Sequence, residues 1–222
     1  MPAAQTRTNW FAIGISAAVV VILLVLGGFV VYLNNQASAP GEAPESTALI
    51  DSETGAISFG TGETTIDTYI DFMCPYCASF EESYGETLQT AASNDEITLN
   101  IHPVSILNGR SQGTEYSSRA GGSMYCVAAE APDAALDYFN LLFANQPDEG
   151  TSGLSDEELI AFAEQVGAGE AADCITDGTY MSYVDDQTDA HEITGTPTVE
   201  VNGERLDLQD ETDFQKFTDA IS

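Results

Sequence analysis

The sequence has 222 residues, of which five are Lys or Arg and 36 are Asp or Glu, giving a formal net charge of −31 at pH 7. A surface this negative repels phosphate groups, so nucleic acid is excluded as a partner. The hydrophobic content of 43% excludes a chain that is disordered throughout. The four cysteines are too few for a scaffold held together by disulfides.

An apolar run without a charged residue, Trp10 to Leu33, lies near the N-terminus. At about 1.5 Å per residue, a helix of this length spans roughly 36 Å, enough to cross a bilayer. Arg7 precedes the run and acidic residues follow it, so the positive-inside rule places the N-terminus in the cytoplasm. We predict a cytoplasmic stub (1–9), a single-pass anchor in the cell membrane (10–33), a flexible linker (34–54) and an extracytoplasmic domain (55–222).

The competing interpretation of the apolar run is a cleaved signal peptide. Ala37-Ser38-Ala39 resembles a cleavage triplet, but Pro40 would follow the cut, which is unfavourable. The run is also long for the apolar part of a signal peptide, so we expect a retained anchor. Both interpretations place the domain outside the cytoplasm, where disulfides persist.

Alternating apolar and polar residues predict strands, most clearly from Thr64 to Phe72. The other expected strands are 55–59, 97–104 and 197–201, and Asn202-Gly203 then predicts a type I′ hairpin turn. Helical spacing predicts a helix from Pro75, a block of helices over about 113–190 and a last helix over 210–221. Within the block, Ser155 and Glu158 form a capping-box pattern. The order of elements predicts an α/β fold with a helical insertion.

The tetrapeptide Cys74-Pro75-Tyr76-Cys77 directly follows a predicted strand and opens a predicted helix. Two sulfurs at this spacing in the first turn of a helix can close a small disulfide ring. The free N–H groups at the helix N-terminus stabilise a thiolate on the first cysteine. A thiolate is the attacking group in thiol–disulfide exchange, so we expect Cys74 to be the nucleophile and Cys77 the resolving cysteine.

Two other interpretations of the pair are half of a zinc site and a buried structural disulfide. Cys126 and Cys174 are isolated, and His102 and His191 have no ligand spacing, so no metal and no other cofactor is expected. A pair between a strand and a helix is typical of redox chemistry, which disfavours a purely structural disulfide.

Thr196-Pro197 forms a second element of interest because proline opens a predicted strand there. A proline at this place is tolerated only where its missing N–H does no harm. A cis bond before Pro197 would present the Thr196 backbone to an extended peptide, whereas a trans strand start is the commoner arrangement.

The chain resembles the DsbA-like branch of the thioredoxin superfamily in its order of features: a strand, the sequence CPYC, a helix, a helical insertion and the sequence GTPTVEVNG. The chain is also similar to the membrane-tethered thiol-disulfide oxidoreductases of Gram-positive bacteria, including the actinobacterial type. The resemblance covers about residues 55–222 and includes Asp71-Phe72-Met73, Pro103 with Leu107, and Tyr125-Cys126-Val127-Ala128. It implies a thioredoxin-like fold, a cis-proline at Pro197 that faces the CxxC, and a first attack at Cys74.

The chain departs from that pattern at two places. Many relatives have a buried acidic residue six positions before the first cysteine, where this chain has Thr68. A proton shuttle from that position is therefore absent, and the strand alternation puts Asp67 and Asp71 on the other face. The dipeptide Pro75-Tyr76 also lacks the histidine that strong oxidases of this kind often carry.

Cys126 and Cys174 fall on separate segments of the expected insertion. Some relatives that the chain resembles carry a disulfide in the insertion, and the two cysteines are accordingly expected to pair. Such a bond closes a loop of about 49 residues and contributes roughly 3–4 kcal/mol in the chain-entropy model. The alternatives are a second redox pair and two unpaired thiols.

The resemblance implies an extracytoplasmic thiol:disulfide oxidoreductase that forms disulfides in exported cysteine-containing proteins. Thr196 and Pro197 would hold the substrate strand, and a membrane partner of the DsbB or VKOR type would reoxidise the pair. We expect a monomer, since no dimerisation segment is visible. The alternatives are a disulfide reductase or isomerase and a non-catalytic binding module with a thioredoxin-like groove.

Overall fold

The computed structural model describes residues 22–23, 25–28 and 41–221. Of the expected anchor, residues 22–23 and 25–28 are helical, and the remainder of 10–33 lies outside the described residues, as do the stub and 34–40. Among the residues that are described, no helix has both the length and the apolar character needed to cross a membrane. The account below concerns the unit that begins at Gly41.

A six-stranded sheet with the order β1-β2-β4-β3-β5-β6 forms the centre of this unit. β3 and β4 pair in parallel, and every other neighbouring pair is antiparallel. Parallel strands need a crossover connection, which here is helical. The strands are β1 (Ile50–Asp51), β2 (Ala56–Phe59), β3 (Thr64–Ile70), β4 (Ile97–Pro103), β5 (Thr198–Val201) and β6 (Glu204–Leu206).

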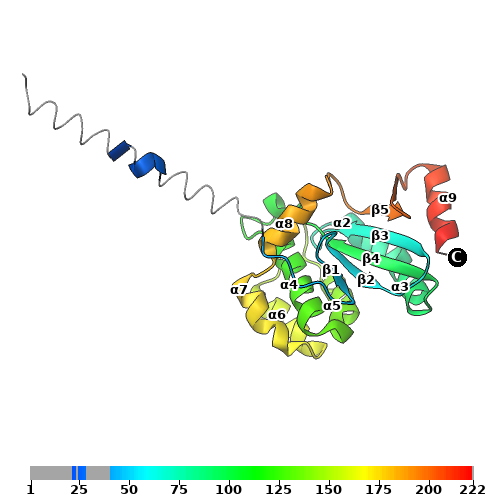
Figure 1. Cartoon of the computed structure of the whole chain (residues 1–222), viewed down its shortest axis with the longest axis horizontal. Helices are drawn as coiled ribbons and strands as arrows, with labels where there is room; N and C mark the ends of the chain where they lie inside the picture. The colour runs from blue at the N-terminus through cyan, green and yellow to red at the C-terminus, as the bar shows by residue number, and fades with distance from the viewer. Residues whose placement is uncertain (1–21, 24, 29–40, 222) are drawn as a thin grey trace, which may run out of the picture. The chain divides into compact units, whose positions relative to one another are not determined.

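The helices fall into three groups. The crossover contains α2 (Pro75–Phe80), the π-helix η1 (Glu81–Gly85) and α3 (Glu86–Ser93). The insertion contains η2 (Asn108–Arg110), α4 (Tyr116–Glu130), η3 (Pro132–Ala134), α5 (Ala135–Ala144), α6 (Asp156–Gln165), η4 (Gly169–Ala171), α7 (Ala172–Asp177) and α8 (Met181–Ala190), and α9 (Glu211–Ala220) follows β6. In Figure 1, α4 to α7 gather at one end of the unit and α9 lies at the other.

The predicted α/β fold with a helical insertion is confirmed. Ser155 caps α6 by accepting a hydrogen bond from the Glu158 N–H, and the Glu158 side chain accepts from the Ser155 N–H, which completes the capping box. Asn202 and Gly203 both have positive φ angles, of 52° and 78°, as a type I′ turn between β5 and β6 requires.

The expected linker, 34–54, extends too far into the chain. Ile50 and Asp51 form β1, which pairs with β2 and places the Ile50 side chain in the core at 1% exposure. Tyr183 of α8 donates a hydrogen bond to the Ser52 carbonyl oxygen, which fixes the same segment. A strand of two residues carries no periodic pattern, and this is why its sequence did not indicate it.

Gly153, in the loop before α6, packs against the buried ring of Tyr116. Its φ is +70°, and an added Cβ would lie 2.2 Å from the ring carbon Cγ of Tyr116. Gly153→Ala is therefore expected to lower the free energy of unfolding by about 2–4 kcal/mol, measured by urea unfolding. Gly150→Ala is the matched control, because Gly150 has φ +87° with nothing within 4 Å of the added Cβ, and should lose only about 1–2 kcal/mol. Equal losses in the two variants would contradict the packing argument.

Candidate functional site

The two cysteines of the CPYC sequence lie at the N-terminus of α2, immediately after the turn that follows β3. Cys74 is the N-cap residue, and its carbonyl oxygen accepts hydrogen bonds from the Cys77 and Ala78 N–H groups at 3.0 and 3.2 Å. Pro75 occupies the first turn, where a missing N–H costs nothing. Both cysteines are free thiols, with residue exposures of 5% for Cys74 and 0% for Cys77. The start of α2 therefore places the Cys74 sulfur at the edge of the interior and encloses the Cys77 sulfur.

The two thiols differ in acidity. A hydrogen bond from the Cys77 thiol is the largest influence on Cys74, and the Thr196 side chain and the N–H groups of Cys77 and Tyr76 act in the same direction. These donors outweigh burial and lower the pKa of Cys74 to about 6. Burial raises the pKa of Cys77 well above its ordinary value, and the neighbouring Cys74 adds to this effect. At pH 7 Cys74 is accordingly the thiolate and Cys77 the protonated partner.

The Thr196–Pro197 peptide bond is cis and lies against the cysteine pair. In its protonated form, the Cys74 thiol donates a hydrogen bond to the Thr196 carbonyl oxygen, which lies 3.3 Å from the sulfur. Thr196 and Pro197, which were singled out separately from the cysteines in the sequence, thus meet Cys74 in the folded chain.

A groove of about 380 Å³ lies beside this contact. Its lining residues come from the start of α2, from the cis-proline segment and from the connection between β6 and α9: Tyr76, Thr196, Pro197, Leu206, Asp207, Leu208 and Gln209. The Tyr76 residue is 74% exposed, although tyrosine is more often partly buried. The groove offers apolar surface and one carboxylate beside the contact between Cys74 and Thr196.

Two residues at the site were not identified from the sequence. Gln146, which follows α5, donates a hydrogen bond from its side-chain nitrogen to the Cys74 carbonyl oxygen at 2.9 Å. Asp71 was expected on the strand face opposite Thr68 and was given no role at the site; its side chain is fully buried next to the cysteine turn. β3 ends at Ile70, so strand alternation no longer applies at Asp71. No local sequence signal points to Gln146, because the contact joins residues 72 positions apart.

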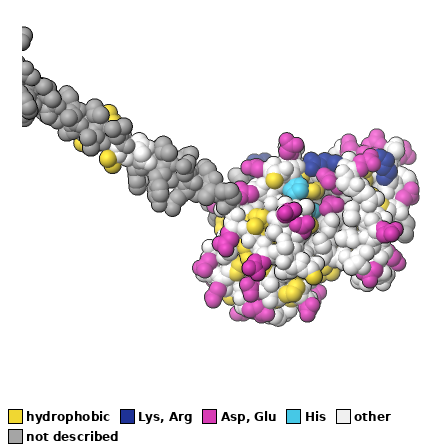
Figure 2. All heavy atoms as spheres, in the orientation of Figure 1, with side chains coloured by type: hydrophobic (Ala, Val, Ile, Leu, Met, Phe, Trp, Pro, Cys, Tyr) yellow, Lys and Arg dark blue, Asp and Glu magenta, His cyan; other side chains and the backbone are white. Residues whose placement is uncertain are grey.

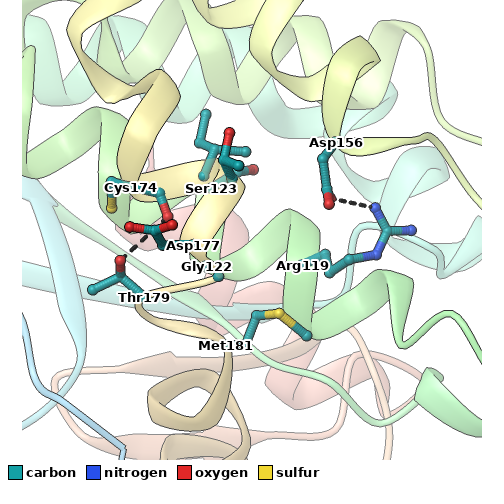
Figure 3. Close-up of a pocket in the computed structure, with 11 residues that line it drawn as sticks. Arg119, Gly122, Ser123, Asp156, Cys174, Asp177, Thr179 and Met181 are labelled. Carbon is teal, nitrogen blue, oxygen red and sulfur yellow. Dashed lines mark hydrogen bonds and ion pairs between the residues drawn. The ribbon is translucent and has the colours of Figure 1, made fainter.

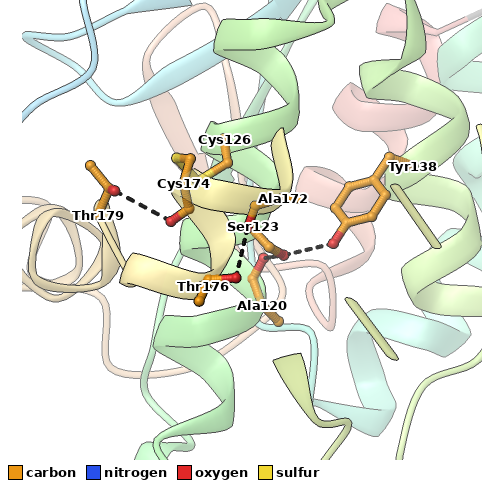
Figure 4. Close-up of a disulfide and its surroundings, with 8 residues drawn as sticks. All are labelled: Ala120, Ser123, Cys126, Tyr138, Ala172, Cys174, Thr176 and Thr179. Atoms are coloured by element: carbon orange, nitrogen blue, oxygen red, sulfur yellow. Dashed lines mark hydrogen bonds between the residues drawn. A yellow bond between two sulfur atoms is a disulfide. The ribbon is translucent and has the colours of Figure 1, made fainter. Parts of the chain in front are cut away.

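The insertion contains a disulfide between Cys126 of α4 and Cys174 of α7, with an S–S distance of 2.00 Å (Figure 4). Cys126 is 1% exposed, and Thr179 donates to the Cys174 carbonyl oxygen close to the bond. Beside the disulfide is a cavity of about 130 Å³, and the Arg119–Asp156 ion pair forms part of its lining (Figure 3). All residues that line this cavity belong to the insertion or its connections, so it is separate from the groove at Cys74.

Comparison with known proteins identifies the family. The family model described as thioredoxin matches residues 60–220. DsbA from Mycobacterium tuberculosis is 29% identical, covers 75% of this chain and 93% of its own, and superposes with a TM-score of 0.66. The thiol-disulfide oxidoreductase MdbA from Actinomyces oris is 26% identical, with coverages of 82% and 90% and a TM-score of 0.62. Fold and site define a DsbA-like thiol-disulfide oxidoreductase domain. The chain belongs to the thioredoxin family.

A further relative is the serine/threonine-protein kinase PknE of Mycobacterium tuberculosis, which is 33% identical over 148 residues. The matched part covers 61% of this chain but 26% of the kinase. The chain therefore corresponds to about a quarter of the length of that relative.

Proposed function

We propose that this chain is an extracytoplasmic, membrane-anchored enzyme that forms disulfides in exported proteins by exchange at Cys74 and Cys77. The observation that carries the proposal is the placement of the pair: Cys74 caps the N-terminus of α2, where neighbouring donors lower its pKa to about 6, and Cys77 is enclosed one turn further on, where burial raises its pKa. A thiolate that is stabilised in the reduced enzyme makes the corresponding disulfide a good oxidant. The relatives described as DsbA and as thiol-disulfide oxidoreductases support the same chemistry.

In the proposed reaction, a substrate thiolate attacks the Cys74 sulfur of the Cys74–Cys77 disulfide, and the S–S bond breaks. The Cys77 sulfur leaves and takes up a proton. A second substrate thiolate then attacks the substrate sulfur of the mixed disulfide, and Cys74 leaves as a thiolate. The substrate loses two electrons and the enzyme gains them. The cis-proline segment would hold the substrate strand, because the Thr196 carbonyl oxygen already contacts Cys74.

The remaining parts of the proposal concern the surroundings of the domain. Residues 10–33 would anchor the chain in the membrane with residues 1–9 in the cytoplasm, as the apolar run and Arg7 indicate. A quinone-coupled membrane protein of the DsbB or VKOR type would remove the electrons from Cys74 and Cys77. The enzyme would act as a monomer. Figure 2 shows acidic side chains spread over the visible face of the domain, which favours substrates that are neutral or basic.

A redox titration against glutathione tests the direction of electron flow. The full chain in detergent is equilibrated at a series of ratios of reduced to oxidised glutathione. At each ratio, mass spectrometry measures the fraction of Cys74 that reacts with an alkylating reagent. An oxidase is expected to have a potential above the roughly −200 to −230 mV of glutaredoxins. A potential near or below about −270 mV would instead indicate a reductase. A cysteine pair whose redox state never changes over the titration would contradict exchange chemistry and would favour the alternative of a non-catalytic binding module.

A further inference from the structure

The Asp71 carboxylate is enclosed where three segments of the domain meet. It accepts hydrogen bonds from the Met73 N–H at 2.8 Å, the Leu107 N–H at 2.9 Å and the Ser117 hydroxyl at 2.7 Å. These donors come from the turn before Cys74, the loop after β4 and the first turn of α4. All three are uncharged, so the carboxylate is hydrogen-bonded without a cation to neutralise it. A buried charge held in this way exerts a strong field on its neighbours.

The neighbours of Asp71 include both thiols of the site. The Cys74 N–H donates to the Asp71 carbonyl oxygen at 2.9 Å, and the Asp71 N–H stabilises negative charge on Cys77. Burial is the main reason that the pKa of the Asp71 carboxyl is raised to about 6; the three donors act against it, and the negative charge of Cys74 acts in the same direction as burial. Tyr116 of α4 is the other titratable group that faces it, and burial and neighbouring charges raise the pKa of that phenol.

Electrostatic coupling between two groups is reciprocal. If the Cys74 thiolate disfavours a charged Asp71, a charged Asp71 must disfavour the Cys74 thiolate by the same free energy. The reduced enzyme contains that thiolate, whereas the oxidised enzyme does not. A negative charge on Asp71 therefore favours the disulfide over the reduced pair.

We propose that Asp71 is a positioning residue that moderates the oxidising strength of the Cys74–Cys77 pair through its charge. The inference deepens the proposed exchange reaction and rests on it. When a substrate dithiol is oxidised, two S–H bonds of the substrate lose their protons and the enzyme disulfide gains two electrons. Cys77 takes one proton, and the second passes to water or to Asp71, whose affinity for it rises when Cys74 becomes a thiolate.

Asp71→Asn tests the proposal by removing the charge while keeping the shape and one acceptor oxygen. The pKa of Cys74 in the reduced full chain is measured from the pH dependence of alkylation. It is expected to fall, and the equilibrium with glutathione should shift roughly threefold to tenfold toward the reduced enzyme. A purely structural role would lower the stability without moving these two quantities in this direction. An unchanged Cys74 pKa in a folded Asp71→Asn chain would overturn the proposal.

Asp185→Asn is the matched control. Asp185 of α8 accepts hydrogen bonds from Ser105 and Ser118, and thus fastens the same loop to the same helix α4. The Asp185→Asn variant should have the same Cys74 pKa as the parent chain. An equal shift in both variants would mean that loop attachment, not charge, sets the acidity, and the proposal would fall.

A second measurement uses the unaltered chain, in case Asp71→Asn does not fold. The pKa of the Asp71 carboxyl is followed by carbon NMR in the reduced and the oxidised protein. It should be higher in the reduced protein, because only that form carries the Cys74 thiolate. Equal values in the two forms would overturn the proposal. Both measurements observe the side chains without a substrate, so their failure would leave the proposed exchange reaction standing.

Discussion

Cys74→Ser is expected to lower the rate of thiol–disulfide exchange by at least about 10³-fold, because the serine hydroxyl forms no thiolate and no disulfide at neutral pH. Cys77 cannot take over the reaction, because it is fully enclosed and its pKa is raised by burial. The rate is measured by the oxidation of a two-cysteine peptide under excess glutathione disulfide. Undiminished turnover in Cys74→Ser would remove Cys74 from its proposed role.

Cys77→Ser provides the companion experiment on the same helix turn. Here Cys74 still attacks a substrate disulfide, but no second sulfur is available to release the bound chain. Covalent complexes that a thiol reductant dissolves should accumulate, and they should be absent in Cys74→Ser. If complexes formed equally well in both variants, the assignment of attacking and resolving sulfur would be wrong.

Removal of the insertion disulfide by Cys126→Ala with Cys174→Ala is expected to lower the free energy of unfolding by about 3–4 kcal/mol. The bond joins residues 48 positions apart, and a closed loop of that length restricts the unfolded chain strongly. Cys126 is also enclosed at 1% exposure, so the substitution leaves a small gap in the core of the insertion. Urea unfolding of both chains without reductant measures the difference.

The appropriate control for this experiment is Cys74→Ala with Cys77→Ala. A bond between these cysteines closes a ring of only four residues, so the loop-closure contribution is much smaller. Its loss should therefore cost clearly less than the loss of the insertion disulfide. Equal free energies of unfolding for the parent chain and the Cys126→Ala, Cys174→Ala variant would show that the long loop is restrained by other contacts.

Much of this fold could be predicted because its signals are local. The alternation in Thr64–Ile70, the capping box at Ser155 and the turn at Asn202-Gly203 each specify their element within a few residues. The placement of Cys74 at a helix N-terminus follows in the same way from a strand, a proline and a helical pattern. Local patterns of this kind survive folding when the tertiary contacts agree with them.

The site residues that could not be predicted are positioned by contacts that lie outside the local sequence patterns. Asp71 lies one residue beyond the end of β3, and its buried carboxylate accepts hydrogen bonds from the turn before Cys74, from the loop after β4 and from α4. Gln146 reaches the Cys74 carbonyl oxygen only because the insertion packs near the start of α2. Contacts between segments that are distant in the sequence produce no periodic pattern within a window of ten residues, so they cannot be predicted from such a window.

The basic residues of the described domain have a consequence for its behaviour in solution. Arg110, Arg119 and Arg205 each pair with one carboxylate and Lys216 pairs with two, whereas the many other acidic side chains of the described domain have no Lys or Arg partner. Dissolved cations must supply the missing compensation by gathering around the domain. Raising the ionic strength weakens these five ion pairs but also relieves the repulsion among far more carboxylates. The ionic atmosphere is thus a stabilising component of the folded state.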